Sequence, residues 1–244
     1  MTSKALLNSV ISDLNALSFN HMADALKDLY KSERYASLDH IAVLREILTP
    51  EFEARQNTKL ANRLKLAHLK GCPEEIENCV NSEHREYLPN GITETLRSLD
   101  FVENGLNICI LGSSDSGKTY LAKSLGILAC TRYSVEYCHC EQLVESLAAL
   151  KSVSHTQYEK KIRMLTKRDL LIIDDFLLHT ITEEREVKIL FEIMEKRSEL
   201  HNSTIVCSQR EPKSWTAMIL NDAVAADALL KRATKHYTVF ISTR

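Results

Sequence analysis

Glycine, proline and tryptophan are scarce in this 244-residue chain, which has six, four and one of them respectively. This scarcity excludes a collagen-like or low-complexity chain, and 44% apolar beside 26% charged residues are typical of a globular protein. The sequence also lacks an apolar run of membrane-spanning length and a small-residue cleavage pattern near its start, so we expect a cytoplasmic protein. A net charge of −2 excludes attraction of nucleic acid by the whole molecule, so any such contact needs a local basic patch.

The cysteines form no pattern that predicts a disulfide framework or a zinc site. There are seven, an odd number, and several fall in segments with the periodicity of strands or helices. Cys138-His139-Cys140 places its side chains on alternate faces of an expected strand, with no second ligand pair at zinc-like spacing. The sequence therefore favours buried thiols in a reducing compartment.

The most informative motif is G-x-x-x-x-G-K-T at residues 112–119, which follows an apolar run and precedes a helical pattern. A loop in this setting directs backbone N–H groups, and the positive end of a helix, toward one point that suits a phosphate. We expect Lys118 to reach the β and γ phosphates and the Thr119 hydroxyl to ligate Mg²⁺. Asp115 stands where such loops often have glycine, and aspartate tolerates left-handed backbone angles better than most residues. The residues expected to contact the nucleotide are Gly112, Ser113, Ser114, Asp115, Ser116, Gly117, Lys118, Thr119 and Tyr120.

Two carboxylates follow a buried strand at residues 170–173, as expected for the second half of a phosphate-loop site. Asp174 is predicted to hold Mg²⁺ through water, and Asp175 to orient or deprotonate the attacking water. Gln209 follows Ser208 at the end of the next strand, where a side chain can hydrogen-bond the γ-phosphate or that water. The sequence thus predicts a complete site for ATP and Mg²⁺.

Strands and helices alternate from residue 107 onward, which predicts an α/β fold with a parallel five-stranded sheet covered by helices on both faces. The strands are expected at residues 107–111, 135–139, 170–174, 204–208 and 237–242. The helices between them are expected at 118–131, 141–150, 156–166, 183–199 and within 214–231.

The opening region has a helical apolar periodicity that predicts a small all-helical domain over residues 1–72, followed by a connector at 73–90 and the α/β domain at 91–244. Thr49 and Pro50 predict the start of a long helix, and Gly71 predicts its end. Basic residues at helical spacing along it predict a ridge that binds nucleic acid. The candidate DNA contacts are Arg55, Lys59, Arg63 and Lys70 on this helix, and Lys160, Lys161 and Arg163 before the Asp-Asp strand.

These motifs together resemble the IstB-like ATP-binding proteins, the helper ATPases of insertion-sequence transposition, which are related to DnaC-type helicase loaders in the AAA+ class. The resemblance extends over the whole chain and is carried by residues 17–26, 55–69, 112–122, 169–176, 203–215 and 226–244. The chain departs from the family pattern where the loop lacks the usual Pro-Pro-Gly, where Leu177 replaces a frequent glycine, and where Lys231 replaces a common aspartate. Asp175 stands in place of the glutamate that is common across AAA+ proteins, although the Asp-Asp pair is usual in this family.

The resemblance implies roles that the spacing of residues could not show. Arg232 matches the arginine that completes the site of a neighbouring subunit, and Ser242 to Arg244 match the closing Ser-x-Arg. The helical lid of many AAA+ proteins is expected to be absent. The implied partners are duplex DNA, a cognate transposase and further copies of the chain, which assemble with ATP.

Several alternatives remain open from the sequence. A helicase loader has the same ATPase motifs and differs in its partner, which is a protein ring. A small-molecule kinase shares the loop and sheet, although no arginine-bearing lid is evident. A scaffold that is locked by nucleotide, with vestigial hydrolysis because of Asp115, is a further possibility.

Overall fold

The computed structural model describes residues 3–32, 37–220 and 223–243, which divide into two compact units, Met1–Asn62 and Arg63–Arg244. Arg244, which ends the expected Ser-x-Arg, lies outside the described residues. No helix in the described part of the chain is both long and apolar enough to cross a bilayer.

The first unit contains α1 (Ser3–Ala16), α2 (Asn20–Lys31) and most of α3 (His40–Leu66). The predicted helix start at Thr49 is wrong, because α3 begins at His40 and continues through Pro50. The Asp39 carboxylate caps the true start by accepting hydrogen bonds from the backbone N–H groups of Ile41 and Ala42, both at 2.8 Å. A proline removes a single helical N–H, and here the surrounding turns keep the helix intact.

The predicted end of this helix at Gly71 is also wrong, since α3 ends at Leu66. The N–H of Leu69 bonds to the Leu64 carbonyl and that of His68 to the Lys65 carbonyl, which is the hydrogen-bond pattern of a Schellman motif. His68 has the left-handed φ of 60° that this motif requires and that a glycine usually supplies. Lys70 therefore follows the helix and does not extend its basic face.

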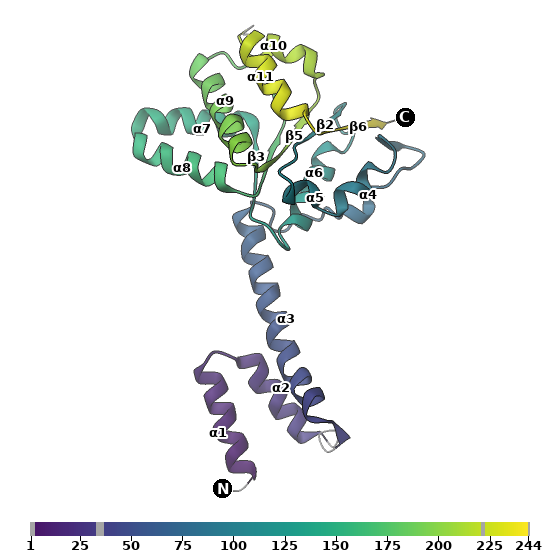
Figure 1. The fold of residues 1–244 in the computed structure, drawn as a ribbon, viewed down its shortest axis with the longest axis vertical. Helices are drawn as coiled ribbons and strands as arrows, with labels where there is room; N and C mark the ends of the chain where they lie inside the picture. The colour runs from purple at the N-terminus through teal and green to yellow at the C-terminus, as the bar shows by residue number, and fades with distance from the viewer. Residues whose placement is uncertain (1–2, 33–36, 221–222, 244) are drawn as a thin grey trace. The chain divides into compact units, whose positions relative to one another are not determined.

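The second unit is built on a six-stranded sheet in the order β1-β6-β2-β5-β4-β3. Four of these strands, β2, β3, β5 and β6, are labelled in Figure 1. The five predicted parallel strands are confirmed, and their bounds are β2 Ile108–Gly112, β3 Val135–His139, β4 Leu170–Asp174, β5 Ser203–Ser208 and β6 Tyr237–Thr243. The sixth strand, β1 (Arg85–Leu88), pairs antiparallel with β6 and lies within the predicted connector. The segment 73–90 thus completes the edge of the sheet.

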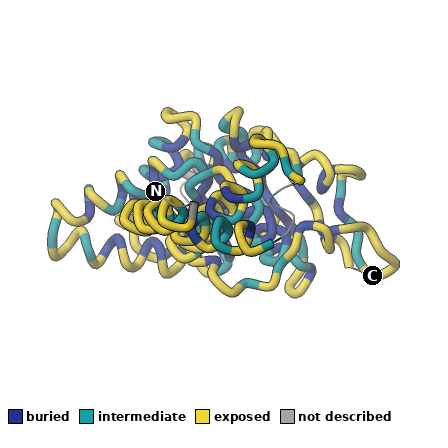
Figure 2. The backbone as a smooth tube through the Cα atoms, turned by 90° about the horizontal axis from the view of Figure 1, so that it is seen from below, coloured by how far each residue is buried: buried dark blue, intermediate teal, exposed yellow. Residues whose placement is uncertain are grey.

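Helices cover both faces of this sheet, as predicted. One face carries α6 (Lys118–Ala129), and the other carries α9 (Glu184–Glu199) and α11 (Ala223–Thr234). The remaining elements are η2 (Ile76–Asn78), α4 (Ile92–Arg97), α5 (Asp100–Glu103), α7 (Cys140–Val153), α8 (His155–Lys167), η3 (Pro212–Ser214) and α10 (Trp215–Met218). Figure 2 marks buried residues in dark blue, and they include every residue of β4 and β5. β2 and β4 consist almost entirely of apolar residues, whereas β5 also buries Ser203, Thr204 and Ser208.

One buried charge joins the ends of α8, α9 and β5. Arg197 is 1% exposed and donates hydrogen bonds to the carbonyls of Leu165, Arg168 and Ser203 and to the hydroxyl of Thr204. Burial lowers the pKa of its guanidinium to about 9. This residue fixes the turn that leads from α8 into β4, the strand that carries the two carboxylates.

Candidate nucleotide site

The predicted phosphate loop connects β2 to α6 at the carboxyl edge of the sheet. Gly117 precedes the first helical residue with φ 100°, and Asp115 has φ 59°, so both occupy the left-handed region. A Cβ atom at Gly112 would lie 2.6 Å from the Ile241 carbonyl oxygen and from Ser116 Oγ. The glycines are required for backbone conformation and close packing, and the prediction that aspartate tolerates the loop conformation is confirmed.

Lys118 is 6% exposed, and its Nζ donates a 2.5 Å hydrogen bond to the Ser113 carbonyl of the same loop. Burial lowers the pKa of its ammonium, while nearby anionic groups that include Asp174 and Asp175 oppose that shift. The lysine is therefore held inside the loop. Its ammonium can replace the Ser113 carbonyl by a phosphate oxygen as hydrogen-bond acceptor.

Asp174 is the most constrained carboxylate of the site. It is 1% exposed, and its Oδ2 accepts hydrogen bonds from Thr119 Oγ1 at 2.7 Å and from the Tyr137 hydroxyl at 2.8 Å. The backbone N–H of Asp175 donates to Asp174 Oδ1 at 2.9 Å. Two hard oxygen ligands thus lie within hydrogen-bond distance of each other beside the phosphate loop, and this donor set fits Mg²⁺.

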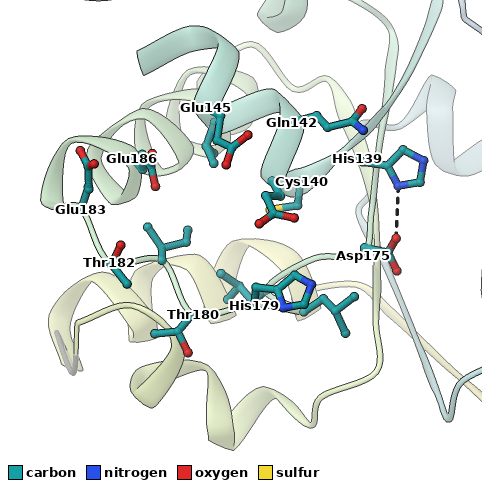
Figure 3. A pocket seen from close by; sticks show the side chains of 15 residues that line it. His139, Cys140, Gln142, Glu145, Asp175, His179, Thr180, Thr182, Glu183 and Glu186 are labelled. Atoms are coloured by element: carbon teal, nitrogen blue, oxygen red, sulfur yellow. Dashed lines mark hydrogen bonds and ion pairs between the residues drawn. The ribbon is translucent and has the colours of Figure 1, made fainter. Parts of the chain in front are cut away.

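Asp175 and the adjoining hollow are drawn in Figure 3. Its Oδ2 lies 3.2 Å from His139 Nδ1, and its side chain is 39% exposed, so the carboxylate is oriented yet accessible. The hollow, of about 400 Å³, is also lined by Glu141, Glu145, Glu183 and Glu186. Burial and these like charges raise the pKa of Glu186.

A second hollow, of about 450 Å³, joins the loop to the ends of β4 and β5, whose following residues were expected to act on phosphate. It is lined by Glu74, Ser114, Asp115, Gly117, Lys118, Thr119, Tyr120, Asp175 and Gln209. The structure thus brings Gln209 and Asp175 together at the loop. By contrast, Ser208 is buried and donates to the Phe176 carbonyl, and Ser116 is buried beside Gly112.

Arg232 does not line this hollow. Its guanidinium lies 3.3 Å from Glu195 Oε1, donates to the Ala228 carbonyl and sits over the Phe191 ring at 5.0 Å. These contacts hold it on the α9–α11 side of the sheet, so within one chain it contributes nothing to the loop.

The residues predicted to contact DNA differ in whether their charged groups already have partners within the protein. Arg55 bonds to Glu51 at 2.7 Å and covers the Phe19 ring, while Arg63 donates to the Cys130 and Thr131 carbonyls at the end of α6. Lys161 lies 3.4 Å from the buried carboxylate of Glu136. The remaining candidates are exposed, namely Lys59, Lys70, Lys160 and Arg163.

Sequence reasoning missed Tyr137 and His139 as contacts of the two carboxylates. They are two residues apart on β3, which pairs with β4 in the register that sets His139 beside Asp174. Side chains two apart share one face of a strand, and that spacing was the available signal. Within the described ranges, no group of three His, Cys, Asp or Glu side chains is arranged to hold a metal ion.

Comparison with known proteins places this geometry in a family. The sequence profile of the IstB-like ATP binding protein family matches residues 12–243. The chain is 32% identical over 230 residues to an insertion sequence ATP-binding protein of Sinorhizobium fredii, covering 93% of this chain and 90% of that one. It is 29% identical over 235 residues to the IS232 ATP-binding protein of Bacillus thuringiensis, covering 93% and 89%.

Solved structures of low identity agree in fold. AMPPCP-bound DnaA from Aquifex aeolicus superposes with a TM-score of 0.56 at 24% identity, over 70% of this chain and 51% of that one, so the match spans about half of DnaA. The DnaC helicase loader superposes with a TM-score of 0.53 at 17% identity, over 70% and 98%. These neighbours have the same fold over about 70% of this chain. The profile match over residues 12–243, together with the 32% identity to the Sinorhizobium fredii protein, leads to one conclusion: the chain belongs to the IstB-like ATP binding protein family.

Proposed function

We propose that this protein is a Mg²⁺-dependent ATPase that assembles on duplex DNA and assists a transposase in selecting or activating its target. The observation that carries the proposal is one hollow at the phosphate loop that is lined by Lys118, Thr119, Asp175 and Gln209. Asp174 lies behind it and accepts a hydrogen bond from Thr119. Membership of an ATP-binding family of insertion sequences supports it.

The chemistry follows from the position of each group. The loop N–H groups and the Lys118 ammonium bind the phosphates, and Thr119 with Asp174 would hold Mg²⁺, which when bound supplies positive charge against the β and γ phosphates. Asp175 accepts a proton from, or orients, the attacking water, and His139 fixes the direction of its carboxylate. Gln209 lies where it can bond to the γ-phosphate or to that water.

Arg232 is proposed to act in the site of a neighbouring copy. Its distance from its own chain's hollow requires a second subunit, in which it would stabilise charge developing on the γ-phosphate. Release from Glu195, 3.3 Å away, would accompany that docking. Hydrolysis is therefore expected to be slow in isolated chains and faster in assemblies on DNA or with transposase.

DNA binding is proposed for the exposed basic residues, above all Lys160 and Arg163 on one helix and Lys59 on another. Phosphate contacts of this kind give affinity without sequence choice and weaken steeply with salt. Arg55, Arg63 and Lys161 are expected to contribute less, because their charges already have partners within the protein.

The test is electron microscopy and gel shift of the full chain with ATP, Mg²⁺ and a short duplex. Wild-type protein should assemble on DNA, Lys118→Ala should not, and Lys160→Glu with Arg163→Glu should assemble less at the same salt. Protein that neither shifts DNA nor grows beyond a dimer contradicts the proposal. Binding to a replicative helicase ring in place of DNA would favour the helicase-loader alternative.

A further inference from the structure

The segment 73–79 belongs to the predicted connector 73–90 and packs beside the phosphate-loop hollow, which Glu74 lines. The Tyr120 hydroxyl accepts hydrogen bonds from the Glu75 backbone N–H at 3.2 Å and from Asn78 Nδ2 at 3.1 Å. Ile76 and Cys79 are 3% and 0% exposed. Because Tyr120 directly follows the Gly-Lys-Thr of the loop, these contacts hold the segment against the first turn of α6.

Glu74 brings a carboxylate from this segment into the lining of the hollow. Its side chain is 13% exposed, and Oε1 lies 3.6 Å from Lys123 Nζ, which is an ion pair too long for a good hydrogen bond. Its Oε2 is buried and has no hydrogen-bond partner among the described residues. A buried carboxylate oxygen without a donor is unfavourable, so a turn of the carboxylate that brings this oxygen to a donor on a ligand in the hollow would be stabilising.

The chemistry of ATP decides which part of the ligand can supply that donor. The phosphate groups carry negative charge and act as acceptors, so they are repelled by Glu74 and are attracted to Lys118 and the loop. The donors of ATP are all on its nucleoside, namely the two ribose hydroxyls and the exocyclic amine of adenine. A carboxylate in the same hollow as the phosphate loop therefore suits the nucleoside end.

We propose that Glu74 accepts a hydrogen bond from the nucleoside of bound ATP. This bond would make the protein bind ATP more tightly than a bare polyphosphate. Glu74 acts as a specificity-determining residue, and Tyr120 keeps its segment in place. Lys123 balances the charge of the carboxylate. This inference rests on the proposed ATP site and adds the recognition of the nucleoside to it.

The test compares the binding of ATP and of inorganic tripolyphosphate, each with Mg²⁺, to the full chain by calorimetry. For wild-type protein ATP should bind more tightly, and Glu74→Ala should weaken ATP by about tenfold while leaving tripolyphosphate unchanged. Glu74→Gln should have an intermediate effect, since its amide oxygen still accepts. Glu77→Ala, an exposed glutamate of the same segment, is the matched control and should change neither ligand.

Nucleotide analogues distinguish the two sources of the donor. If a ribose hydroxyl is the donor, the loss in Glu74→Ala should shrink for the matching 2′- or 3′-deoxy nucleotide, and if the amine is the donor it should shrink for inosine triphosphate. If folded Glu74→Ala has the same ratio of ATP to tripolyphosphate affinity as wild type, the inference is overturned. The same holds if the substitution lowers the melting temperature and leaves that ratio unchanged. Failure of wild-type protein to bind either ligand overturns the proposed function instead.

Discussion

Replacing Tyr137 by phenylalanine removes one of three hydrogen bonds that fix the Asp174 carboxylate. The bond is 2.8 Å long and lies in a site where Asp174 is 1% exposed, so water cannot easily take its place. A hydrogen bond to a charged group contributes about 1.5–3 kcal/mol. Because Thr119 and the Asp175 N–H still hold the carboxylate, we expect the lower end, which corresponds to about tenfold.

The assay is the Mg²⁺ concentration that gives half-maximal ATP hydrolysis, with Mg²⁺-dependent binding of a fluorescent ATP analogue as a second readout. Tyr137→Phe should raise that concentration by about tenfold and change the maximal rate less, because the variant disturbs the carboxylate that is proposed to hold the metal. The matched control is Tyr158→Phe, which deletes a 2.6 Å hydrogen bond from another buried tyrosine to the Glu192 carboxylate, away from the loop. Equal Mg²⁺ dependence in the two variants would refute the reasoning.

Three further changes test other parts of the structure. Asp115→Asn keeps a residue that tolerates φ 59° and removes an exposed negative charge from the hollow, so the dissociation constant of ATP should fall by about fivefold with unchanged melting temperature. Arg197→Met leaves buried carbonyls without donors and should lower the free energy of unfolding by about 3–5 kcal/mol in urea titrations; a loss below about 1 kcal/mol would contradict this role. The pKa of Glu186 is raised in the fold, so its ionised form weakens the native state above the unfolded value near 4.5. Glu186→Gln should therefore raise the melting temperature at pH 7 and leave it unchanged at pH 4, and a gain of equal size at both pH values would argue against the charge effect.

The sequence predicted the parts of the fold that depend on local pattern. Apolar runs located the five parallel strands, and the G-x-x-x-x-G-K-T motif located the loop, because both signals lie within a few residues. The four-residue strand β1 escaped, since its pairing with β6 joins residues more than 150 positions apart and no periodicity marks it. Pro50 led to the wrong helix start, because α3 continues through it and the continuity of a helix depends on all its turns, not on one residue.

Residues with left-handed backbone angles show a second feature that the sequence could not predict. The resemblance implied a glycine at the position of Leu177, and the structure gives this leucine φ 52° with 1% exposure. Left-handed backbone costs a leucine about 1–2 kcal/mol, while burial of its side chain contributes about as much or more. The sequence shows the substitution alone, and the compensating burial is visible only in the folded chain. The contacts of Tyr137 and His139 with the two carboxylates are likewise set by the β3–β4 register.

Calorimetric titration of the wild-type chain with Mg²⁺ and a non-hydrolysable ATP analogue, without DNA, tests the central claim most directly. The arrangement of Lys118, Thr119 and Asp174 predicts one nucleotide per chain, binding that weakens when Mg²⁺ is omitted, and loss of the signal in Lys118→Ala. Absence of heat from folded wild-type protein, or equal binding by Lys118→Ala, would contradict it.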